Sequence, residues 1–239
     1  MASIKIRPLH IGKITRQKMA FCYWLDPGEI ADIPLISYYI EGADKNILVD
    51  TGGGDPNEAN PHWLPYERKE DQTIQNALRK IGVSCDEIDI VINTHLHWDH
   101  CGGNALFPKA TIFVQQAELE SAHAPLPLMA HGYNKRMVED IEYTVISGDQ
   151  KIVDGVQVIL TPGHTYGMQG VLVEGEKNRY FIASDTFGFF KNLEINPPTP
   201  SGIYVDLKKY YQSIQRIGEL KAFILPGHDF KVFDSEIYL

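Results

Sequence analysis

A dense cluster of metal-binding residue types limits the folds open to this chain. The run His95-Leu96-His97-Trp98-Asp99-His100 places four side chains that bind metals well within six positions. Residues 88–93, just before it, are rich in β-branched residues and predict a buried strand. Gly102 and Gly103, just after it, permit a tight turn. Metal ligands where a strand ends and a loop begins indicate a metal-dependent enzyme.

The composition is that of a globular protein with an acidic surface. A chain of 239 residues can bury a large core, and we expect residues 1–239 to form a single domain. Its 44% hydrophobic and 22% charged residues are ordinary for a globular soluble protein. The net charge of −9 argues against nucleic acid, whose binding needs Lys and Arg to displace counterions.

Cysteine usage and hydropathy bear on the compartment. Three scattered cysteines without a CxxC pair favour a reducing, cytoplasmic setting over a disulfide framework. No apolar run approaches the length of a membrane span, so we expect no membrane partner. Basic residues before the apolar run 19–25 resemble the charge order of a signal peptide. That run ends in Asp26-Pro27-Gly28, which predicts a loop with exposed aromatic residues instead.

Strand and helix patterns alternate along the whole chain. Further strands are expected at residues 35–40, 46–49, 110–114, 156–160, 170–173, 179–183 and 222–225. Amphipathic helices are expected at residues 71–81 and 206–220, with a shorter one at 115–123. Asp71 is the predicted N-cap of the first helix, and Gly82 is predicted to end it. Residues 47–51 and 181–186 resemble each other, which suggests two related half-sheets.

The first cluster provides ligands for two metal ions. His95 and His97 alternate along an extended segment, so both can face one ion. Asp99 and His100 can then hold a second ion, although Asp99 could instead be a turn or capping residue. Each ion needs more ligands to reach four or five.

Three more ligand-type residues each follow a predicted strand. His164 is expected to complete the first site and His228 the second, while Asp185 bridges both ions with its two oxygens. A lone His after a strand is more often a surface residue, so the argument depends on the whole set. Five histidines and two aspartates suit two zinc ions, and the carboxylates also leave manganese or iron open. The other four histidines lack such a setting and are interpreted as surface or loop residues: His10, His62, His123 and His131.

In these residues the chain resembles the metallo-β-lactamase-fold hydrolases. The HxHxDH run, followed by His164, Asp185 and His228, has the order and spacing of that family, and residues 48–52 resemble its early strand and turn. The resemblance covers about residues 34–228. It implies an α+β fold, an αββα four-layer sandwich with a two-metal site at one edge of the facing sheets.

Within that superfamily the chain is most similar to the N-acyl-homoserine lactonases and related small-lactone hydrolases. The similar stretches are residues 34–40 leading to 48–52, residues 95–104 and Pro162-Gly163-His164. One departure stands out. Those lactonases usually carry a Tyr three positions after the bridging Asp, where it helps to bind the substrate carbonyl, and this chain has Gly188 there.

The expected reaction is the opening of a lactone by attack of a metal-bridging hydroxide on the carbonyl carbon. Asp99 would hold the second ion and pass a proton to the leaving oxygen. Oxyanion stabilisation would come from metal alone or from a donor that the sequence does not identify. Asp50, Thr94 and Thr165 are candidates for orienting the ligands, although such residues also commonly serve strand-end turns.

Aromatic clusters suggest where the substrate lies. Loops near a strand-end metal site commonly shape the pocket, which gives the candidates Phe21, Trp24, Trp63, Tyr66, Phe187, Gly188 and Phe189. The substrate would then be a small lactone with an apolar part. Large apolar residues are more often core, and exposed aromatics near the N-terminus suit a homodimer contact equally well.

These residues are also compatible with two other classes of function. The same scaffold could hydrolyse a thioester, an amide or another ester. A non-hydrolytic iron oxygenase or redox protein, or a metal-binding module without turnover, is the alternative of a different class. Two zinc ions would favour hydrolysis, whereas iron with oxygen uptake would favour the oxidative class.

Overall fold

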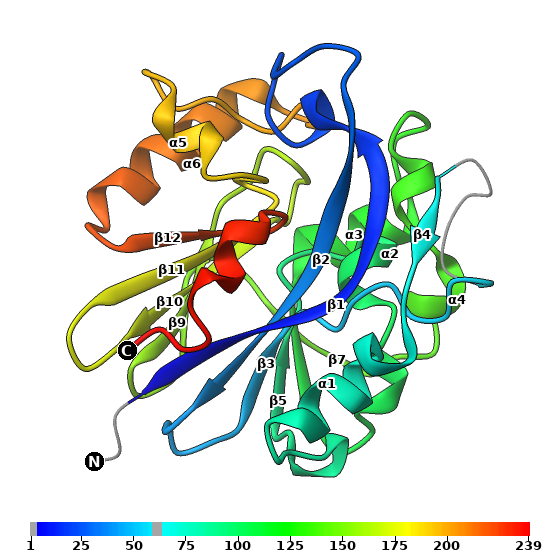
Figure 1. Ribbon diagram of the computed structural model, residues 1–239, viewed down its shortest axis with the longest axis vertical. Coiled ribbons are helices and arrows are strands. Elements are labelled where there is room, and N and C mark those ends of the chain that lie inside the picture. The colour runs from blue at the N-terminus through cyan, green and yellow to red at the C-terminus, as the bar shows by residue number, and fades with distance from the viewer. Residues whose placement is uncertain (1–3, 59–63) are drawn as a thin grey trace.

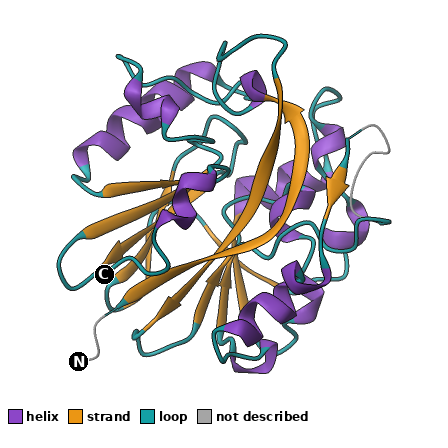
Figure 2. Ribbon diagram, viewed as in Figure 1, coloured by secondary structure: helices purple, strands orange, loops and turns teal. Residues whose placement is uncertain are grey.

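Alternating apolar residues in the central strands build this molecule in four layers. In the computed structural model, which describes residues 4–58 and 64–239, two β-sheets pack face to face and helices cover their outer faces (Figure 1). Figure 2 shows the strands gathered between two groups of helices. This arrangement confirms the predicted α+β fold, an αββα sandwich.

The described residues form a seven-stranded and a five-stranded sheet. The first has the order β4-β1-β2-β3-β5-β6-β7, and the second has the order β12-β11-β10-β9-β8. The strands of the first sheet are β1 (Lys5–Gln17), β2 (Ile30–Glu41), β3 (Ile47–Val49), β4 (Tyr66–Glu67), β5 (Ile90–Ile92), β6 (Thr111–Gln115) and β7 (Tyr143–Ile146). Those of the second are β8 (Gln150–Val153), β9 (Val156–Leu160), β10 (Gln169–Glu174), β11 (Arg179–Ser184) and β12 (Phe223–Pro226).

Helices form the two outer layers, and short helices also lie within the loops that connect the strands. The α-helices are α1 (Ile74–Lys80), α2 (Trp98–Cys101), α3 (Gln116–His123), α4 (Lys135–Val138), α5 (Lys191–Glu194) and α6 (Leu207–Glu219). Helix α1 packs on the first sheet and α6 on the second, each through a buried apolar face. Among residues 4–58 and 64–239, no helix is long and apolar enough to cross a membrane.

The period of two in the strands explains the separate cores. Val49 of β3 and Val171 of β10 belong to the cluster between the sheets. Their neighbours Leu48 and Leu172 belong to the outer clusters, on the opposite faces of the same strands. Each strand therefore contributes to two cores, which is why the central strands are buried almost without interruption.

Strand β1 is absent from the predicted set, and a β-bulge explains why. The pairing of β1 with β2 shifts register between His10 and Lys13, and Gly12 at the shift has φ +132°. The bulge breaks the alternation of apolar residues that would mark a strand. A side chain at Gly12 would also collide with the Tyr66 ring, because a Cβ there would lie 2.9 Å from Tyr66 Cε2.

Most other sequence predictions are confirmed, with one error in a helix cap. Asp71 lies in the 3-10 turn Glu70–Gln72 and does not cap α1. The helix begins one residue after Thr73, whose hydroxyl accepts a hydrogen bond from the Asn76 N–H at 3.2 Å. Gly82 follows the helix in the predicted left-handed conformation, with φ +80°.

Candidate metal centre

Seven side chains that the sequence singles out converge where several strands end. Strands β9, β11 and β12 run in the same direction, so their carboxyl ends share one edge of the second sheet. The converging residues are His95, His97, Asp99 and His100 after β5, His164 after β9, Asp185 after β11 and His228 after β12. All are buried except Asp99, which is partly exposed. Their roles as ligands stay a prediction.

Two strand ends near this cluster turn sharply without glycine. Asp50 follows β3 with φ +60°, and Ser184 ends β11 with φ +46°. Left-handed conformations are uncommon for such residues and cost on the order of 1–3 kcal/mol. Strain of this kind concentrates at functional sites. Here it occurs in the residue before Asp185 and in a residue that contacts His100.

The first group consists of three imidazoles. The Nδ1 atom of His97 lies 3.1 Å from Nε2 of His95 and 3.1 Å from Nε2 of His164. Ligand nitrogens on one tetrahedral zinc ion lie about 3.4 Å apart, because each Zn–N bond is about 2.1 Å long. The spacing of the three nitrogens is therefore close to that of ligands sharing one cation.

Asp185 lies between this group and a second one. Its Oδ1 atom is 2.8 Å from Nε2 of His228 and 3.2 Å from Nε2 of His100. Its Oδ2 atom faces the first group, 3.4 Å from Nε2 of His164. Asp99 completes the second group, with Oδ2 3.8 Å from Nε2 of His100. One carboxylate thus presents an oxygen to each group, which is the geometry of a bridging ligand.

The Nε2 atom of His100, unpartnered among the described residues, tests whether a metal ion fits the second group. Within the described part of the chain, Nε2 of His97 and Nε2 of His100 are buried without a hydrogen-bond partner. The 3.2 Å approach of Asp185 to His100 does not have hydrogen-bond geometry. Buried polar atoms are rarely left without a partner. The His100 nitrogen points into the second group, so a cation there would satisfy it. The residues therefore fit a dinuclear metal centre.

The electrostatics of the cluster favour cation binding. Burial, together with the neighbouring histidines, holds the pKa of His95 and of His97 well below the ordinary value. Neutral imidazoles are the form that binds metals. Burial would raise the pKa of Asp185, but His228, His100 and His164 outweigh it and hold that pKa well below the ordinary value. Asp185 is therefore ionised.

Asp50 and Thr94, two of the predicted ligand-orienting residues, form a hydrogen-bonded chain to His100. Asp50 Oδ2 lies 2.8 Å from Nδ1 of His100, so this carboxylate accepts the Nδ1–H proton and leaves Nε2 facing the site. Thr94 donates to Asp50 through its backbone N–H and its hydroxyl, both at 2.8 Å. Burial would lower the pKa of His100, but the carboxylates of Asp185, Asp99 and Asp50 outweigh it and raise that pKa well above the ordinary value. A metal ion that binds Nε2 therefore has to displace a proton from it.

Backbone carbonyls orient two other histidines. Nδ1 of His164 lies 2.9 Å from the Ile203 carbonyl, and Nδ1 of His228 lies 2.9 Å from the Pro34 carbonyl. Each Nδ1–H can therefore donate to a carbonyl, which leaves the Nε2 lone pair directed at the site. These partners come from loop and strand backbone, so no side-chain pattern in the sequence could reveal them.

Glu118 of α3 is a supporting residue that sequence reasoning missed. It is fully buried, and its carboxylate accepts from the N–H groups of Leu96 and Gly167 and from the hydroxyls of Thr165 and Tyr133. Leu96 lies between two predicted ligands, and Thr165 follows a third. Glu118 therefore ties the two ligand loops together, and Thr165 acts through it. A single Glu in a short amphipathic helix is usually a surface residue, so the sequence does not indicate that Glu118 joins the two loops.

Phe21 and Gly188 of the predicted substrate contacts lie together beside the site. Phe21 is buried with its ring 4.7 Å from the His228 ring, and Phe189 packs 5.8 Å from Phe21. A Cβ at Gly188 would lie 2.6 Å from both Cβ and the carbonyl oxygen of Phe21. Position 188 therefore has no room for a Tyr, because Phe21 occupies the space.

The other predicted contacts are more distant from the cluster. Phe187 packs in the outer core of the second sheet with Tyr210, so it does not line the site. Tyr66 is buried against Trp98, with ring centroids 5.2 Å apart. Trp24 is 61% exposed, in the loop expected to carry exposed aromatics. Trp63 lies outside the described residues.

A narrow pocket of about 30 Å³ lies directly over the predicted ligands. Four of them line it together with apolar side chains: Ile14, Phe21, Leu64, Trp98, Met129 and Ile203. Arg16 and His131 also line this pocket. Neither is predicted as a site residue, since β1 is not recognisable from the sequence and His131 is an isolated loop histidine.

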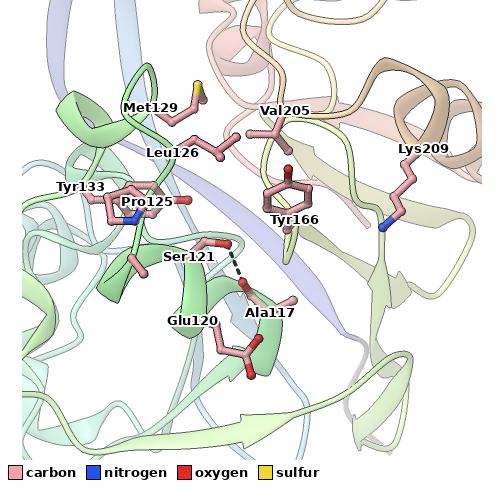
Figure 3. A pocket seen from close by; sticks show the side chains of 11 residues that line it. Ala117, Glu120, Ser121, Pro125, Leu126, Met129, Tyr133, Tyr166, Val205 and Lys209 are labelled. Carbon is pink, nitrogen blue, oxygen red and sulfur yellow. Dashed lines mark hydrogen bonds between the residues drawn. The ribbon is translucent and has the colours of Figure 1, made fainter.

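A larger groove of about 540 Å³ adjoins this pocket. Met129 lines both, and Tyr133, which lines the groove, packs its ring 4.9 Å from the His97 ring. Figure 3 shows Met129 and Leu126 on one side of the groove and Val205 and Tyr166 on the other. Its volume lies in the range of small-molecule sites, and its walls are largely apolar.

Known proteins resemble this chain in sequence and in structure. Residues 36–228 match the sequence model of the metallo-beta-lactamase superfamily. An N-acyl homoserine lactonase from Bacillus sp is 33% identical over 220 residues, covering 86% of this chain and 85% of that protein. The N-acyl homoserine lactonase AiiB of Agrobacterium fabrum is 26% identical over 232 residues, covering 87% and 84%.

One solved structure of similar fold contains a bound reaction product. It is an N-acyl homoserine lactone hydrolase with the product N-hexanoyl-L-homoserine bound at its catalytic metal centre. It superposes with a TM-score of 0.85 at 28% identity, and covers 98% of this chain and 96% of that one.

Proposed function

The chain belongs to the metallo-β-lactamase superfamily, and on that basis we propose that it is a dinuclear metal-dependent hydrolase that opens lactones of the N-acyl homoserine lactone type. The observation that carries this proposal is the convergence of seven donor residues with Asp185 at their centre, since each Asp185 oxygen faces a different group. The similarity to lactonases over most of the chain supports the substrate class.

We assign the ligands in two sets. His95, His97 and His164 would hold the first ion, and Asp99, His100 and His228 the second, with Asp185 shared. Zinc suits a donor set so rich in imidazole, while manganese or iron would also accept the two carboxylates. When bound, the ions would supply hydroxide at neutral pH and polarise the carbonyl of the ester.

The side chains have separate tasks in this reaction. Asp50 and Thr94 keep the Nε2 lone pair of His100 directed at the site, and Glu118 fixes the loops around it. Asp99, at the partly exposed side of the cluster, would accept a proton from the attacking water and pass it to the leaving alcohol oxygen. The products are a hydroxy-carboxylate and a released proton.

We infer that the apolar part of the substrate lies in the groove next to the metal pocket (Figure 3). Met129 lines both spaces, so an acyl chain attached to the reacting ring can pass from one to the other. Leu126, Tyr166 and Val205 would contact this chain. The bound product of the related hydrolase has such an acyl chain.

We also infer a cytoplasmic protein that folds as a single domain over residues 1–239. Free cysteines at positions 22, 85 and 101 suit a reducing compartment. Tyr23 and Trp24 are exposed and could form the contact of a homodimer, in which the partner would cover both side chains. Analytical ultracentrifugation would detect such a dimer.

A pH-indicator assay of the purified protein, with metal content measured on the same sample, tests the proposed function. The substrates are acyl-homoserine lactones of several chain lengths, simple γ- and δ-lactones, aromatic lactones and thioesters, with the Asp185→Ala variant as the control. Fast acid release from one lactone class, abolished by a chelator, is the expected result. Two bound ions with no lactone hydrolysis would refute the lactonase function and point to a thioester, amide or other ester.

A further inference from the structure

We propose that Arg16 binds the carbonyl oxygen of the scissile ester and stabilises the negative charge that develops there. This inference rests on the proposed function, because it assigns a role within the hydrolytic reaction. The tetrahedral transition state of ester hydrolysis carries charge on the former carbonyl oxygen, and fixed donors aimed at that oxygen are a large part of catalysis. A fixed donor in the pocket would therefore add to the stabilisation that the metal ions supply.

Strand geometry directs Arg16 into the metal pocket. Arg16 lies near the end of β1 and pairs with Ala31 of β2. Ile14 and Arg16, two residues apart on the same face, both line the pocket. Thr15 between them points to the other face, where its hydroxyl donates to Asp32 at 2.9 Å. The bulge at Gly12 sets the register of residues 13–17, and this register determines that the Arg16 side chain lies on the pocket face of β1.

The charges around Arg16 identify the part of the pocket that it faces. Burial lowers the pKa of Arg16, and the carboxylates of Asp99 and Asp185 oppose that change. Both carboxylates belong to the predicted ligand set, so the guanidinium lies within electrostatic reach of the reacting centre. Among the described residues that line this pocket, Arg16 is the only Lys or Arg. Its planar fork of N–H donors suits a carboxylate-like oxygen pair.

The small size of the pocket brings a bound ester group against its lining, which includes Arg16. The space over the ligands is only about 30 Å³, so an ester group bound there must touch the side chains that line it. Position 188 cannot supply a side-chain donor, because Phe21 fills the space that a Cβ would need. His131 also lines the pocket, but its side chain is largely exposed, and partial desolvation together with the nearby Arg16 lowers its pKa, so it is less suited to carry a fixed positive charge.

The proposed step leaves Arg16 protonated throughout. A bond forms between the carbonyl carbon and the oxygen of water, and the bond between that carbon and the ring oxygen breaks. The ring oxygen takes a proton and becomes the alcohol, while the new carboxylate stays ionised and a proton is released. Arg16 donates hydrogen bonds to one oxygen of that carboxyl group and exchanges no proton.

Kinetics of Arg16→Met and Arg16→Lys test this role against the lactone that the wild type hydrolyses best. Loss of one oxyanion donor lowers kcat by about 100- to 1000-fold, so we expect a fall of that order in Arg16→Met with a small change in KM. Arg16→Lys should recover part of the loss. Arg7→Met, on the same strand but paired with Glu41, is the matched control and should keep wild-type kcat.

Binding of the ring-opened product, measured by calorimetry, gives a second readout. Arg16→Met should bind it about tenfold or more weakly at unchanged metal content and melting temperature. An unchanged kcat in Arg16→Met, or an equal loss in His131→Gln, would overturn the assignment. A loss confined to KM, or to lactones with an additional carboxylate, would also overturn it and make Arg16 a residue for substrate charge. Wild-type protein with no lactone hydrolysis would instead refute the proposed function.

Discussion

Replacing Glu118 by Gln should destabilise the fold and weaken metal binding, although Glu118 contacts none of the predicted ligands through its side chain. Its two carboxylate oxygens accept four hydrogen bonds, two from backbone N–H groups and two from hydroxyls. Four donors leave no partner for a proton on this carboxyl group. Glutamine has nearly the same shape, so the substitution changes the hydrogen bonding with little change in packing.

The magnitude follows from which bonds an amide can keep. The amide oxygen can accept from Leu96 N–H and the Tyr133 hydroxyl, which lie 2.9 and 3.2 Å from Oε1. The Thr165 hydroxyl can rotate and accept from the new NH₂ group. The Gly167 N–H then faces another N–H group and is left buried without an acceptor. An unsatisfied buried donor costs about 1–3 kcal/mol, so we expect a loss of about 2 kcal/mol in the free energy of unfolding.

Thermal unfolding of the metal-loaded protein, with a metal titration of the apoprotein, measures both effects. About 2 kcal/mol corresponds to a fall in Tm of about 4–8 °C for a chain of this size. Loss of support behind metal ligands lowers metal affinity by about 10- to 100-fold. Glu120→Gln, two positions along α3 and exposed, is the control and should change stability by less than about 0.5 kcal/mol. Equal Tm and metal affinity in the two variants would refute the reasoning.

Three further outcomes are expected. Asp185→Ala should lose at least one ion per chain by elemental analysis and nearly all turnover, whereas full metal content with full activity would rule out a bridging role. Asp50→Asn should weaken metal binding by about 10- to 100-fold, because the partner of His100 Nδ1 changes, and unchanged affinity would contradict that contact. Ala124→Trp, in the groove wall, should raise KM for long-chain lactones and leave short-chain lactones unaffected; an equal effect on both would remove the groove from substrate binding.

The sequence predicts the seven converging residues because each follows a recognisable strand. Apolar runs that end in a ligand-type residue bring those residues to one sheet edge, whatever the loops do. Arg16 could not be predicted in the same way, because the bulge at Gly12 and Pro8 within β1 hide the strand that carries it. Contacts that depend on backbone carbonyls, such as the one from Pro34 to His228, have no side-chain signal at all.

Aromatic residues were the least predictable part of the site. Phe187 and Phe21 are both large apolar residues near predicted ligands, yet one packs in the outer core and the other lines the pocket. Local pattern cannot separate the two, because burial in a core and burial at a pocket select the same residue types. Likewise, the sequence does not reveal that Phe21 occupies the space that a side chain at position 188 would need.

The contact between His228 and Pro34 has a consequence for the order in which the protein matures. Nδ1 of His228 donates to a carbonyl of β2, and Tyr38 of the same strand donates to the Pro226 carbonyl at 2.7 Å. An early strand and a late loop, separated by 194 residues, must meet before the second group is complete. Closing so long a loop is a late event in synthesis. Under the proposed assignment, the ligands of the first ion, up to Asp185, are all synthesised before His228, so we expect the second ion to bind last.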